Sequence, residues 1–227
     1  MNNLLELKNI SKSFITETEI KVLKKLSFTF KKGKVYSLMG PSGAGKSTLL
    51  NLISLIDRPS SGVIKFNNQM INFDKKNKND LFRAKNIGII YQQNNLLPDF
   101  TALENVYLAS LSNGTNKDIA KEKAKDLLKK VGLSNRMGHF PSQLSGGESQ
   151  RVAIVRAIIN EPSIILADEP TGSLDSDNAK LVFKILFNLK NKNRIIIFAT
   201  HNRYFANMAD CKITMNNGNM NITNASI

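Results

Sequence analysis

The sequence contains a single cysteine, Cys211, among its 227 residues. One cysteine excludes a disulfide within the chain and is typical of a cytosolic protein. Long apolar runs are also missing, since no stretch approaches the ~20 apolar residues that a membrane-spanning helix needs. Residues 1–10 do not combine a basic region with an apolar stretch, so we expect no signal peptide.

Acidic residues are scarce relative to basic ones. The chain has 18 Asp and Glu against 32 Lys and Arg, which gives a net charge of +14 and raises the question of nucleic-acid binding. The basic residues are scattered through polar segments, such as 75–76, 117–130 and 190–194, often beside asparagine. No arginine-aromatic array of the kind that stacks on bases accompanies them. We expect no nucleic-acid partner, while attraction to an anionic membrane surface stays open.

A glycine-rich segment with a phosphate-binding pattern begins at residue 40. It reads GPSGAGKST, fits G-x-x-x-x-G-K-[ST], and stands between an apolar run, Val35–Met39, and a helix expected over Lys46–Ile56. Glycines let successive N–H groups turn toward a polyphosphate at the positive end of that helix. Lys46 would reach the β- and γ-phosphates, and Ser47 would bind Mg²⁺. The predicted nucleotide-binding residues are Gly40, Pro41, Ser42, Gly43, Ala44, Gly45, Lys46, Ser47 and Thr48.

A second apolar run ends in two acidic residues. Residues 164–167 read IILA and are followed by Asp168, Glu169 and Pro170. An apolar run that ends in acids is typical of a buried strand with a functional end. A simple turn before Pro170 is the alternative for these acids taken alone. Together with a phosphate-binding loop, the pattern predicts that Asp168 holds Mg²⁺ and that Glu169 orients or deprotonates the attacking water.

A third segment, LSGGESQ over residues 144–150, begins a further helix. Ser145 is a favourable N-cap residue, and Glu148 three positions later completes the pattern of a capping box. The amphipathic run QRVAIVRAII over 150–159 predicts that the helix continues. Taken alone, the segment indicates only a well-capped helix.

With these segments in place, the chain resembles the ATP-binding subunit of an ABC transporter over nearly its full length. Its motifs follow the order of that family. The resemblance implies that LSGGESQ is the signature motif, which caps the nucleotide bound to the opposite subunit from a helix N-terminus. The residues assigned to that contact are Ser145, Gly146, Gly147 and Glu148.

The resemblance also assigns two residues that follow apolar runs. Gln92 comes after residues 87–91 and matches the Q-loop glutamine, which contacts Mg²⁺ and the attacking water. Gln93 follows directly, so the two glutamines remain alternatives for this role. His201 comes after residues 195–199 and matches the switch histidine, which contacts the γ-phosphate.

Two further residues match motifs of the family. Asp175 stands in the D-loop segment Ser173–Asp175, where an aspartate helps to align the two subunits. Phe14 stands where the family has an aromatic residue, commonly tyrosine, that stacks on the adenine ring. Phenylalanine keeps the stacking face without the hydroxyl. Packing in an alternating strand segment is the alternative role for Phe14.

The resemblance implies an α/β fold, a P-loop NTPase core with an antiparallel β subdomain and an inserted α-helical subdomain. We expect a single ATP-binding domain over 1–227, with the core and β subdomain at 1–92 and 156–227 and the helical signature subdomain at about 93–155. The length suits one such domain and is too short for two. Because the resemblance places the signature of one subunit on the nucleotide of the opposite subunit, a complete site needs a second copy of the chain.

Local patterns give the expected elements. Alternation over 4–10 and 26–30 predicts antiparallel strands flanking the strand at 35–39, and residues 62–67 continue the sheet up to an Asn-Asn turn. Thr101 with Glu104 predicts a capped helix. A second helix is expected over 117–131, with one apolar face. The apolar face of this second helix comprises Ile119, Ala120, Ala124, Leu127 and Leu128. Asn-Gly at 217–218 predicts a hairpin.

The implied function is ATP hydrolysis, with ATP and Mg²⁺ as cofactors, powering a separate integral-membrane permease. Residues 91–106, YQQNNLLPDFTALENV, resemble ATPases of lipoprotein-releasing and macrolide-export permeases, and the lipoprotein-releasing type is the first hypothesis. The expected location is the cytoplasmic face of the bacterial inner membrane, held there by the permease. Macrolide or antimicrobial export and a cell-division ATPase are alternatives, as is a permease-free ABC ATPase acting on DNA or ribosomes.

Overall fold

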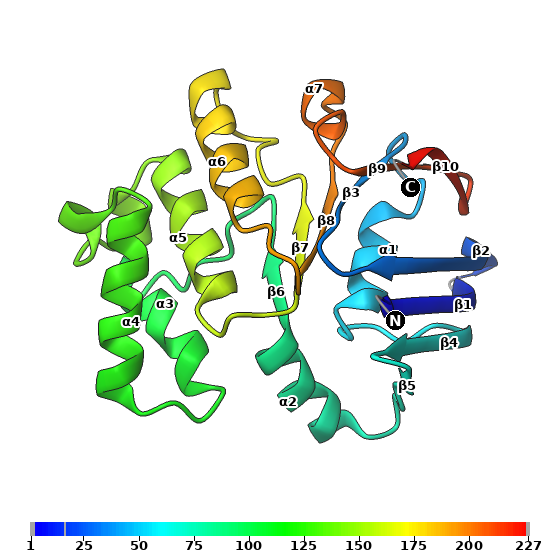
Figure 1. The fold of residues 1–227 in the computed structure, drawn as a ribbon, viewed down its shortest axis with the longest axis horizontal. Coiled ribbons are helices and arrows are strands. Elements are labelled where there is room, and N and C mark those ends of the chain that lie inside the picture. The colour runs from blue at the N-terminus through cyan, green and yellow to red at the C-terminus, as the bar shows by residue number, and fades with distance from the viewer. Residues whose placement is uncertain (1–2, 16, 226–227) are drawn as a thin grey trace. The chain divides into compact units, whose positions relative to one another are not determined.

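The computed structural model describes residues 3–15 and 17–225, which form two compact units. The first unit comprises residues 1–80 and 190–227, and the second comprises residues 81–189 (Figure 1). The division falls within α2 (Lys76–Asn86), a polar helix in which no residue is buried. Among the described residues, no helix is both long enough and apolar enough to span a membrane.

The first unit contains an antiparallel sheet with strand order β2-β1-β4-β5. Its strands are β1 (Asn3–Ile15), β2 (Glu19–Lys31), β4 (Ser61–Phe66) and β5 (Gln69–Met70). The first two strands are longer than the predicted apolar runs, because polar residues continue the pairing to Ile15 and Glu19. The predicted turn between β4 and β5 is present, with φ of 46° at Asn67 and 64° at Asn68.

A second group of strands in the first unit holds the glycine-rich loop. The strand order is β10-β9-β3-β8, and β3 is parallel to both of its neighbours. The strands are β3 (Val35–Met39), β8 (Ile195–Ala199), β9 (Cys211–Asn216) and β10 (Asn219–Ala225). The sequence-based expectation that residues 4–10 and 26–30 flank β3 was wrong. The neighbours of β3 are β8 and β9, strands far from it in the chain.

Two helices belong to the first unit, α1 (Lys46–Ile53) and α7 (Arg203–Ala206). Helix α1 was predicted to reach Ile56 but ends earlier. The hydroxyl of Ser54 donates to the carbonyl of Asn51 over 2.9 Å, and Leu55 has a left-handed backbone with φ of 60°. A left-handed residue breaks the helical hydrogen-bond series, and apolar spacing alone does not reveal it.

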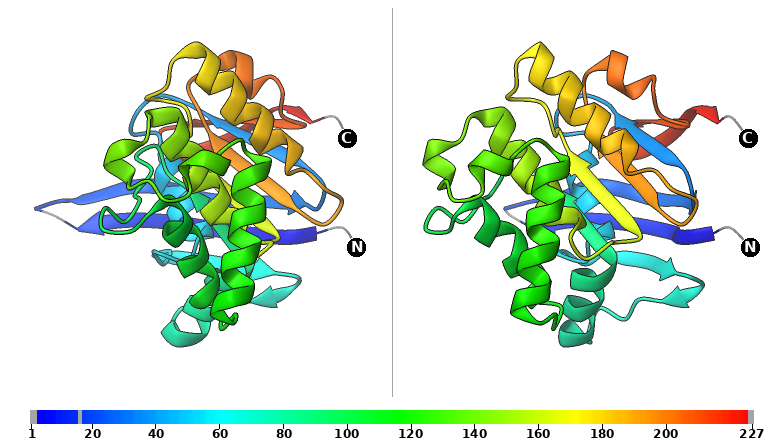
Figure 2. Two further views of the ribbon diagram at one scale, coloured as in Figure 1. Left: turned by 90° about the vertical axis from the view of Figure 1, so that its left-hand side faces the viewer. Right: turned by 60° about the vertical axis from the view of Figure 1, so that its left-hand side comes forward.

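The second unit combines two parallel strands with a layer of helices. The strands are β6 (Ile87–Ile90) and β7 (Ile164–Asp168). The helices are α3 (Ala102–Leu111), α4 (Lys117–Lys130), α5 (Gly146–Ile158) and α6 (Ser176–Asn188), with short 3₁₀ turns at Ser134–Arg136 and Pro141–Gln143. Helices α3, α4 and α5 lie side by side in both views of Figure 2.

The three helices α3, α4 and α5 share one apolar core. It is formed by small and aliphatic residues, including Ala120, Ala124 and Leu128 of α4 and Val155 of α5. Thr101 caps α3 in the predicted capping box with Glu104. The apolar face predicted for α4 was wrong at one position, because Ile119 is 63% exposed.

Candidate nucleotide-binding and hydrolysis site

The glycine-rich loop connects the carboxyl end of β3 to the start of α1. Gly45 caps the helix with a left-handed backbone, φ 96°, and a Cβ at this position would lie 2.7 Å from Cδ2 of Leu23. Glycine is therefore required at this position both by backbone conformation and by space. The Lys46 ammonium donates to the carbonyls of Gly40 over 2.8 Å and of Pro41 over 3.0 Å. The lysine thus lies across the loop it belongs to.

Phe14 lies on β1 with its ring 42% exposed. The Lys12 ammonium is 4.8 Å from the ring centroid, a cation–π distance. Lys12 pairs in register with Leu23, the same residue that Gly45 faces. The strand register therefore brings the aromatic residue and the end of the glycine-rich loop into one region of the first unit.

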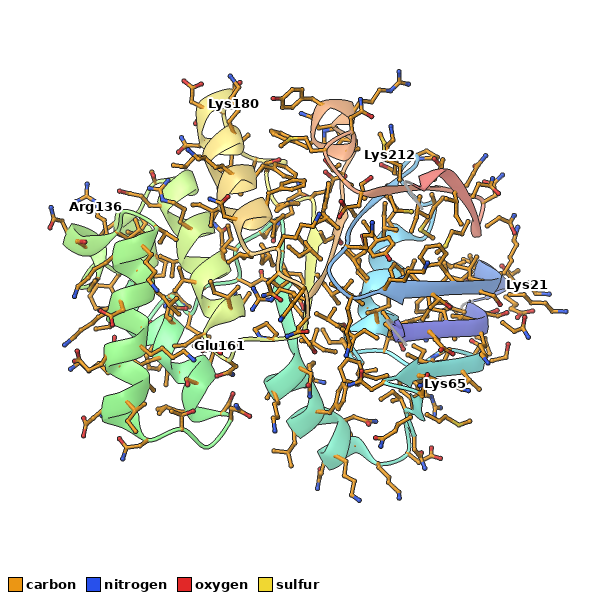
Figure 3. All side chains as sticks on the ribbon, in the orientation of Figure 1. Lys21, Lys65, Arg136, Glu161, Lys180 and Lys212 are labelled. Atoms are coloured by element: carbon orange, nitrogen blue, oxygen red, sulfur yellow. The ribbon has the colours of Figure 1, made fainter. Side chains whose placement is uncertain are left out.

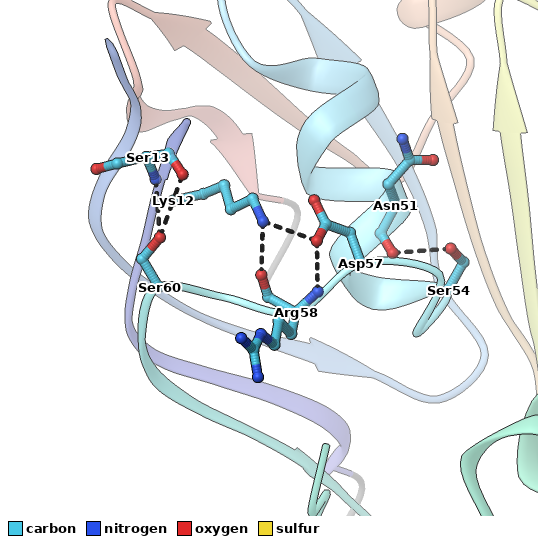
Figure 4. Close-up of polar contacts among 7 residues, drawn as sticks. All are labelled: Lys12, Ser13, Asn51, Ser54, Asp57, Arg58 and Ser60. Atoms are coloured by element: carbon cyan, nitrogen blue, oxygen red, sulfur yellow. Dashed lines mark hydrogen bonds and ion pairs between the residues drawn. The ribbon is translucent and has the colours of Figure 1, made fainter. Parts of the chain in front are cut away.

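Lys12 is buried and is held by the segment that follows α1 (Figure 4). It is 8% exposed, and its ammonium donates to the Asp57 carboxylate over 2.7 Å and to the Arg58 carbonyl over 2.9 Å. A second link joins the same two segments, since the Ser13 N–H donates to the Ser60 hydroxyl over 3.0 Å. Lys12 thus connects the strand of Phe14 to the segment that follows the helix of the glycine-rich loop.

His201 leaves the sheet at the same edge as the glycine-rich loop. Strands β3 and β8 are parallel, Leu38 pairs with Ala199, and the Thr200 N–H donates to the Leu38 carbonyl over 3.1 Å. The carboxyl ends of adjacent parallel strands are where α/β proteins bind their ligands. The loop that carries Lys46 and the segment that carries His201 therefore leave the same edge of this sheet.

The second unit brings together the residues predicted at the ends of β6 and β7. The strands are parallel with Ile90 opposite Ala167, so Gln92 and Asp168 follow the same edge. A Cβ at Gly172 would lie 2.8 Å from Nε2 of Gln92, so the side chain of Gln92 reaches the loop after β7. Glu169, which begins that loop, has a left-handed backbone with φ of 45°.

The signature segment forms the N-terminus of α5, as the capping box predicts. The Ser145 hydroxyl accepts from the Glu148 N–H over 3.2 Å, and the Glu148 carboxylate accepts from the Ser145 N–H over 2.8 Å. Arg136 donates to the same carboxylate over 2.8 Å. The Arg136 hydrogen bond, followed by the Ser145 N–H, lowers the pKa of Glu148 to about 2. A charged Glu148 therefore closes the first turn of α5.

Asp175 caps α6 and lies next to the signature. Its carboxylate accepts from the Asn178 N–H over 3.0 Å and from the Asn178 side-chain amide over 2.6 Å, and this amide lowers the pKa of Asp175. A Cβ at Gly147 would overlap Oδ1 of Asn178, whereas a Cβ at Gly146 would meet only Cδ2 of Leu174 at 3.5 Å. A side chain at Gly147 would therefore displace the Asn178 side chain, which is hydrogen-bonded to Asp175.

Several residues that hold these segments were not predicted from the sequence. Lys12 and Asp57 are far apart in the chain, and only their buried contact identifies them. Asn178 lies three residues after Asp175, a spacing that a capping pattern could have revealed. Cys211 is buried on β9, and burial raises the pKa of its thiol.

A phosphate-binding loop between a parallel strand and a helix defines the chain as a P-loop nucleotide-binding protein. A family model described as ABC transporter matches residues 23–172. The chain belongs to the ABC transporter family. It binds nucleotide and is an ATP hydrolase with the ABC ATPase fold.

The chain is similar over nearly its whole length to lipoprotein-releasing system ATP-binding proteins named LolD. It is 42% identical to the protein of Cytophaga hutchinsonii over 219 residues, which are 96% of this chain and 99% of that relative. It is also 42% identical to the protein of Rickettsia bellii over 225 residues, 98% and 99% of the two chains.

Solved structures of ATP-binding cassettes have the same fold. A dimer of the cassette MJ0796 in a post-hydrolysis state with ADP and Pi has a TM-score of 0.89 and 35% identity, covering 98% of this chain and 100% of that one. The cassette cbiO1 of Clostridium perfringens has a TM-score of 0.84 and 27% identity, over 97% and 88% of the two chains.

Proposed function

We propose that this chain hydrolyses ATP to power a membrane permease that releases lipoproteins from the inner membrane. The observation that carries the proposal is the 42% identity to lipoprotein-releasing system ATP-binding proteins across almost the full length of both chains. Relatives matched from end to end share both the ATPase core and the helical segment through which a permease would be driven. The permease would hold the chain at the cytoplasmic face of the membrane.

ATP would bind first to the first unit. The backbone N–H groups of the loop at Gly40–Thr48 would surround the phosphates at the start of α1. Lys46, whose ammonium contacts the carbonyls of Gly40 and Pro41, would exchange these acceptors for phosphate oxygens. The exposed face of Phe14 would stack on the adenine ring. The Lys12 ammonium would hold the phenyl ring through its cation–π contact.

The residues available for Mg²⁺ suit a hard cation held mainly by phosphates and water. Ser47, Asp168 and Gln92 would supply a hydroxyl, a carboxylate and an amide oxygen, the oxygen ligands that Mg²⁺ prefers. Within the described residues, no group of three or more His, Cys, Asp or Glu side chains is placed to hold a metal. Mg²⁺ would neutralise charge on the β- and γ-phosphates.

Hydrolysis would use the loop after β7. Glu169 would accept a proton from the attacking water, Gln92 would orient that water, and His201 would donate to the γ-phosphate. The contact between Gln92 and Gly172 supports Gln92 over Gln93 for this role. The signature residues Ser145, Gly146, Gly147 and Glu148, with Asp175 beside them, would close the site of a second copy of the chain. The dimeric cassettes among the similar structures support this pairing.

The test is purification of the native protein, through an affinity tag, from detergent-solubilised membranes. We expect an integral-membrane permease to co-purify, and the complex in vesicles to release a lipoprotein when ATP is added. Lys46→Ala is the control that keeps the complex but loses release, because the lysine serves phosphate binding. Co-purification of a drug-export or cell-division permease instead would overturn the proposal that the cargo is a lipoprotein. DNA or ribosomes without a membrane protein would overturn the transport function.

A further inference from the structure

Helix α5 holds the backbone on both sides of Gln92. The Gln150 side-chain amide donates to the Tyr91 carbonyl over 3.2 Å. The Arg156 guanidinium donates to the carbonyls of Asn94 over 2.7 Å and of Asn95 over 2.6 Å. The residue before Gln92 and the residues two and three positions after it are therefore fixed to one helix.

These hydrogen bonds take the place of those that a strand or helix would give the segment. Residues 91–97 belong to no helix or strand, so their carbonyls need other donors. Gln150 is only 1% exposed, and burial lowers the pKa of Arg156. Arg156 is half-buried, and a guanidinium that loses part of its hydration costs free energy unless it is hydrogen-bonded. Both side chains thus give hydrogen bonds to the segment around Gln92.

The same helix begins with the signature. Ser145 caps α5, Gln150 lies five residues further along, and Arg156 lies near the C-terminal end of the helix. An α-helix rises about 1.5 Å per residue and is stiff over this length, so its two anchors are about 9 Å apart on one rigid rod. A displacement of the signature end of α5 therefore displaces the backbone on either side of Gln92.

We propose that Gln150 and Arg156 are positioning residues that fix Gln92 to the signature helix, so that engagement of the signature places the glutamine for hydrolysis. This inference rests on the role proposed above for Gln92. Neither side chain is required to touch nucleotide. The two residues act through the carbonyls of Tyr91, Asn94 and Asn95. In this proposal, the signature of one copy closes the nucleotide site of its partner, whereas Gln92 serves the site of its own copy. Gln150 and Arg156 therefore link the two nucleotide sites.

The test measures kcat and KM for ATP at a temperature well below unfolding. Arg156→Met keeps the side-chain volume but removes both hydrogen bonds. We expect kcat to fall by about tenfold to a hundredfold, the scale of a misplacement of about 1 Å, while KM changes by less than about twofold. Arg156→Lys, which keeps the charge and a single donating nitrogen, is expected to restore part of kcat. Gln150→Met removes the other anchor and is expected to act in the same direction.

The control separates positioning from loss of stability. Val155 neighbours Arg156, is fully buried in the helical core, and contacts none of the residues around Gln92 through a hydrogen bond. Val155→Ala is expected to lower Tm but to leave kcat unchanged at the assay temperature. If both Arg156→Met and Gln150→Met kept the kcat of Val155→Ala, the positioning role would be overturned.

A double-mutant cycle isolates the coupling to Gln92. In a Gln92→Ala background, Arg156→Met is expected to cause no further loss of kcat, because the group it positions is gone. Multiplicative losses would overturn the inference while leaving the role of Gln92 intact. A full kcat in Gln92→Ala alone would overturn the proposed role of Gln92, and the inference with it.

Discussion

Glu169 has a left-handed backbone, φ 45°, directly after β7. Such a conformation is uncommon outside glycine and costs about 1–3 kcal/mol where the surroundings impose it. A turn fixes it, since the Gly172 N–H donates to the Glu169 carbonyl over 3.0 Å. Strain of this kind gathers at functional sites, and it supports the hydrolytic role proposed for Glu169.

At the scale of single residues, Lys12 makes a cation–π contact with the ring of Phe14. Its ammonium is fixed by Asp57 and the Arg58 carbonyl and lies 4.8 Å from the phenyl ring centroid. Lys12→Met should therefore raise KM for ATP by about fivefold to thirtyfold, given about 1–2 kcal/mol for a desolvated cation–π contact. The value of kcat should change little, since Lys46 and Glu169 are untouched. Steady-state ATPase kinetics measure both.

Lys8 provides the matched control for this change. It lies on the same strand, but its side chain is 57% exposed and its carboxylate partner, Glu6, is 3.9 Å away. Lys8→Met should leave KM unchanged, because exposed ion pairs contribute little. Equal KM values for Lys8→Met and Lys12→Met would contradict a role for Lys12 in holding the aromatic face.

At the scale of elements, local pattern predicted how helices begin better than how they end. The capping boxes at Thr101 and Ser145 form as predicted, because a hydroxyl and a glutamate three residues apart satisfy each other's N–H groups locally. The end of α1 depends on the left-handed Leu55, and the polar helix α2 has no apolar face to reveal it. Neither the end of α1 nor the position of α2 is marked by a periodic apolar pattern in the sequence.

The first turn of α5 depends on a charged Glu148. Its pKa of about 2 lies below the usual ~4.3 of a glutamate, so the folded state gains stability from it above pH ~4.3 and loses that gain as pH falls toward 2. Arg136 is the largest cause, and Figure 3 shows it at the outer side of the helices. Arg136→Gln should raise the pKa of Glu148 toward its usual value.

Carboxyl chemical shifts in an NMR pH titration measure this change directly. Lys125→Gln is the control, because its side chain pairs with the exposed Glu122 and not with Glu148. The titration of Glu148 should be the same in the control as in the unmodified protein. An Arg136→Gln variant whose Glu148 still titrated near pH 2 would contradict the assigned cause.

At the scale of the whole molecule, the residues predicted for catalysis are divided between the two units. Lys46, Phe14 and His201 belong to the first unit, while Gln92, Glu169 and the signature belong to the second. Basic side chains are also found in both units. Lysines such as Lys21, Lys65, Lys180 and Lys212 lie on four different elements (Figure 3).

The proposed pairing of two copies gives a whole-molecule prediction. Glu169→Gln should bind Mg-ATP without hydrolysing it and elute as a dimer in size-exclusion chromatography. Adding Gly146→Asp should keep this variant monomeric, because an acid at the exposed start of α5 would repel the partner's nucleotide. Gly146 suits this test because a Cβ there meets only Leu174, at 3.5 Å, so the fold should tolerate it.

Two controls bracket this experiment. Lys46→Ala in the Glu169→Gln background should stay monomeric for lack of bound nucleotide. The Gly146→Asp variant should keep the Tm of its parent, which distinguishes a blocked interface from unfolding. A Glu169→Gln protein that remained monomeric in saturating Mg-ATP would contradict closure by a second copy.

The sequence by itself determined the nucleotide-binding loop, the strands at 35–39 and 195–199, the acids after 164–167 and the capped start of α5. These features depend on neighbours within a few residues, and a local pattern records them fully. The tertiary structure alone decided that β8 and β9 flank β3, that Lys12 meets Asp57, and that Gln150 and Arg156 hold the segment around Gln92. These contacts join residues 45 to 175 positions apart or depend on which side chain is buried, and no local period encodes either.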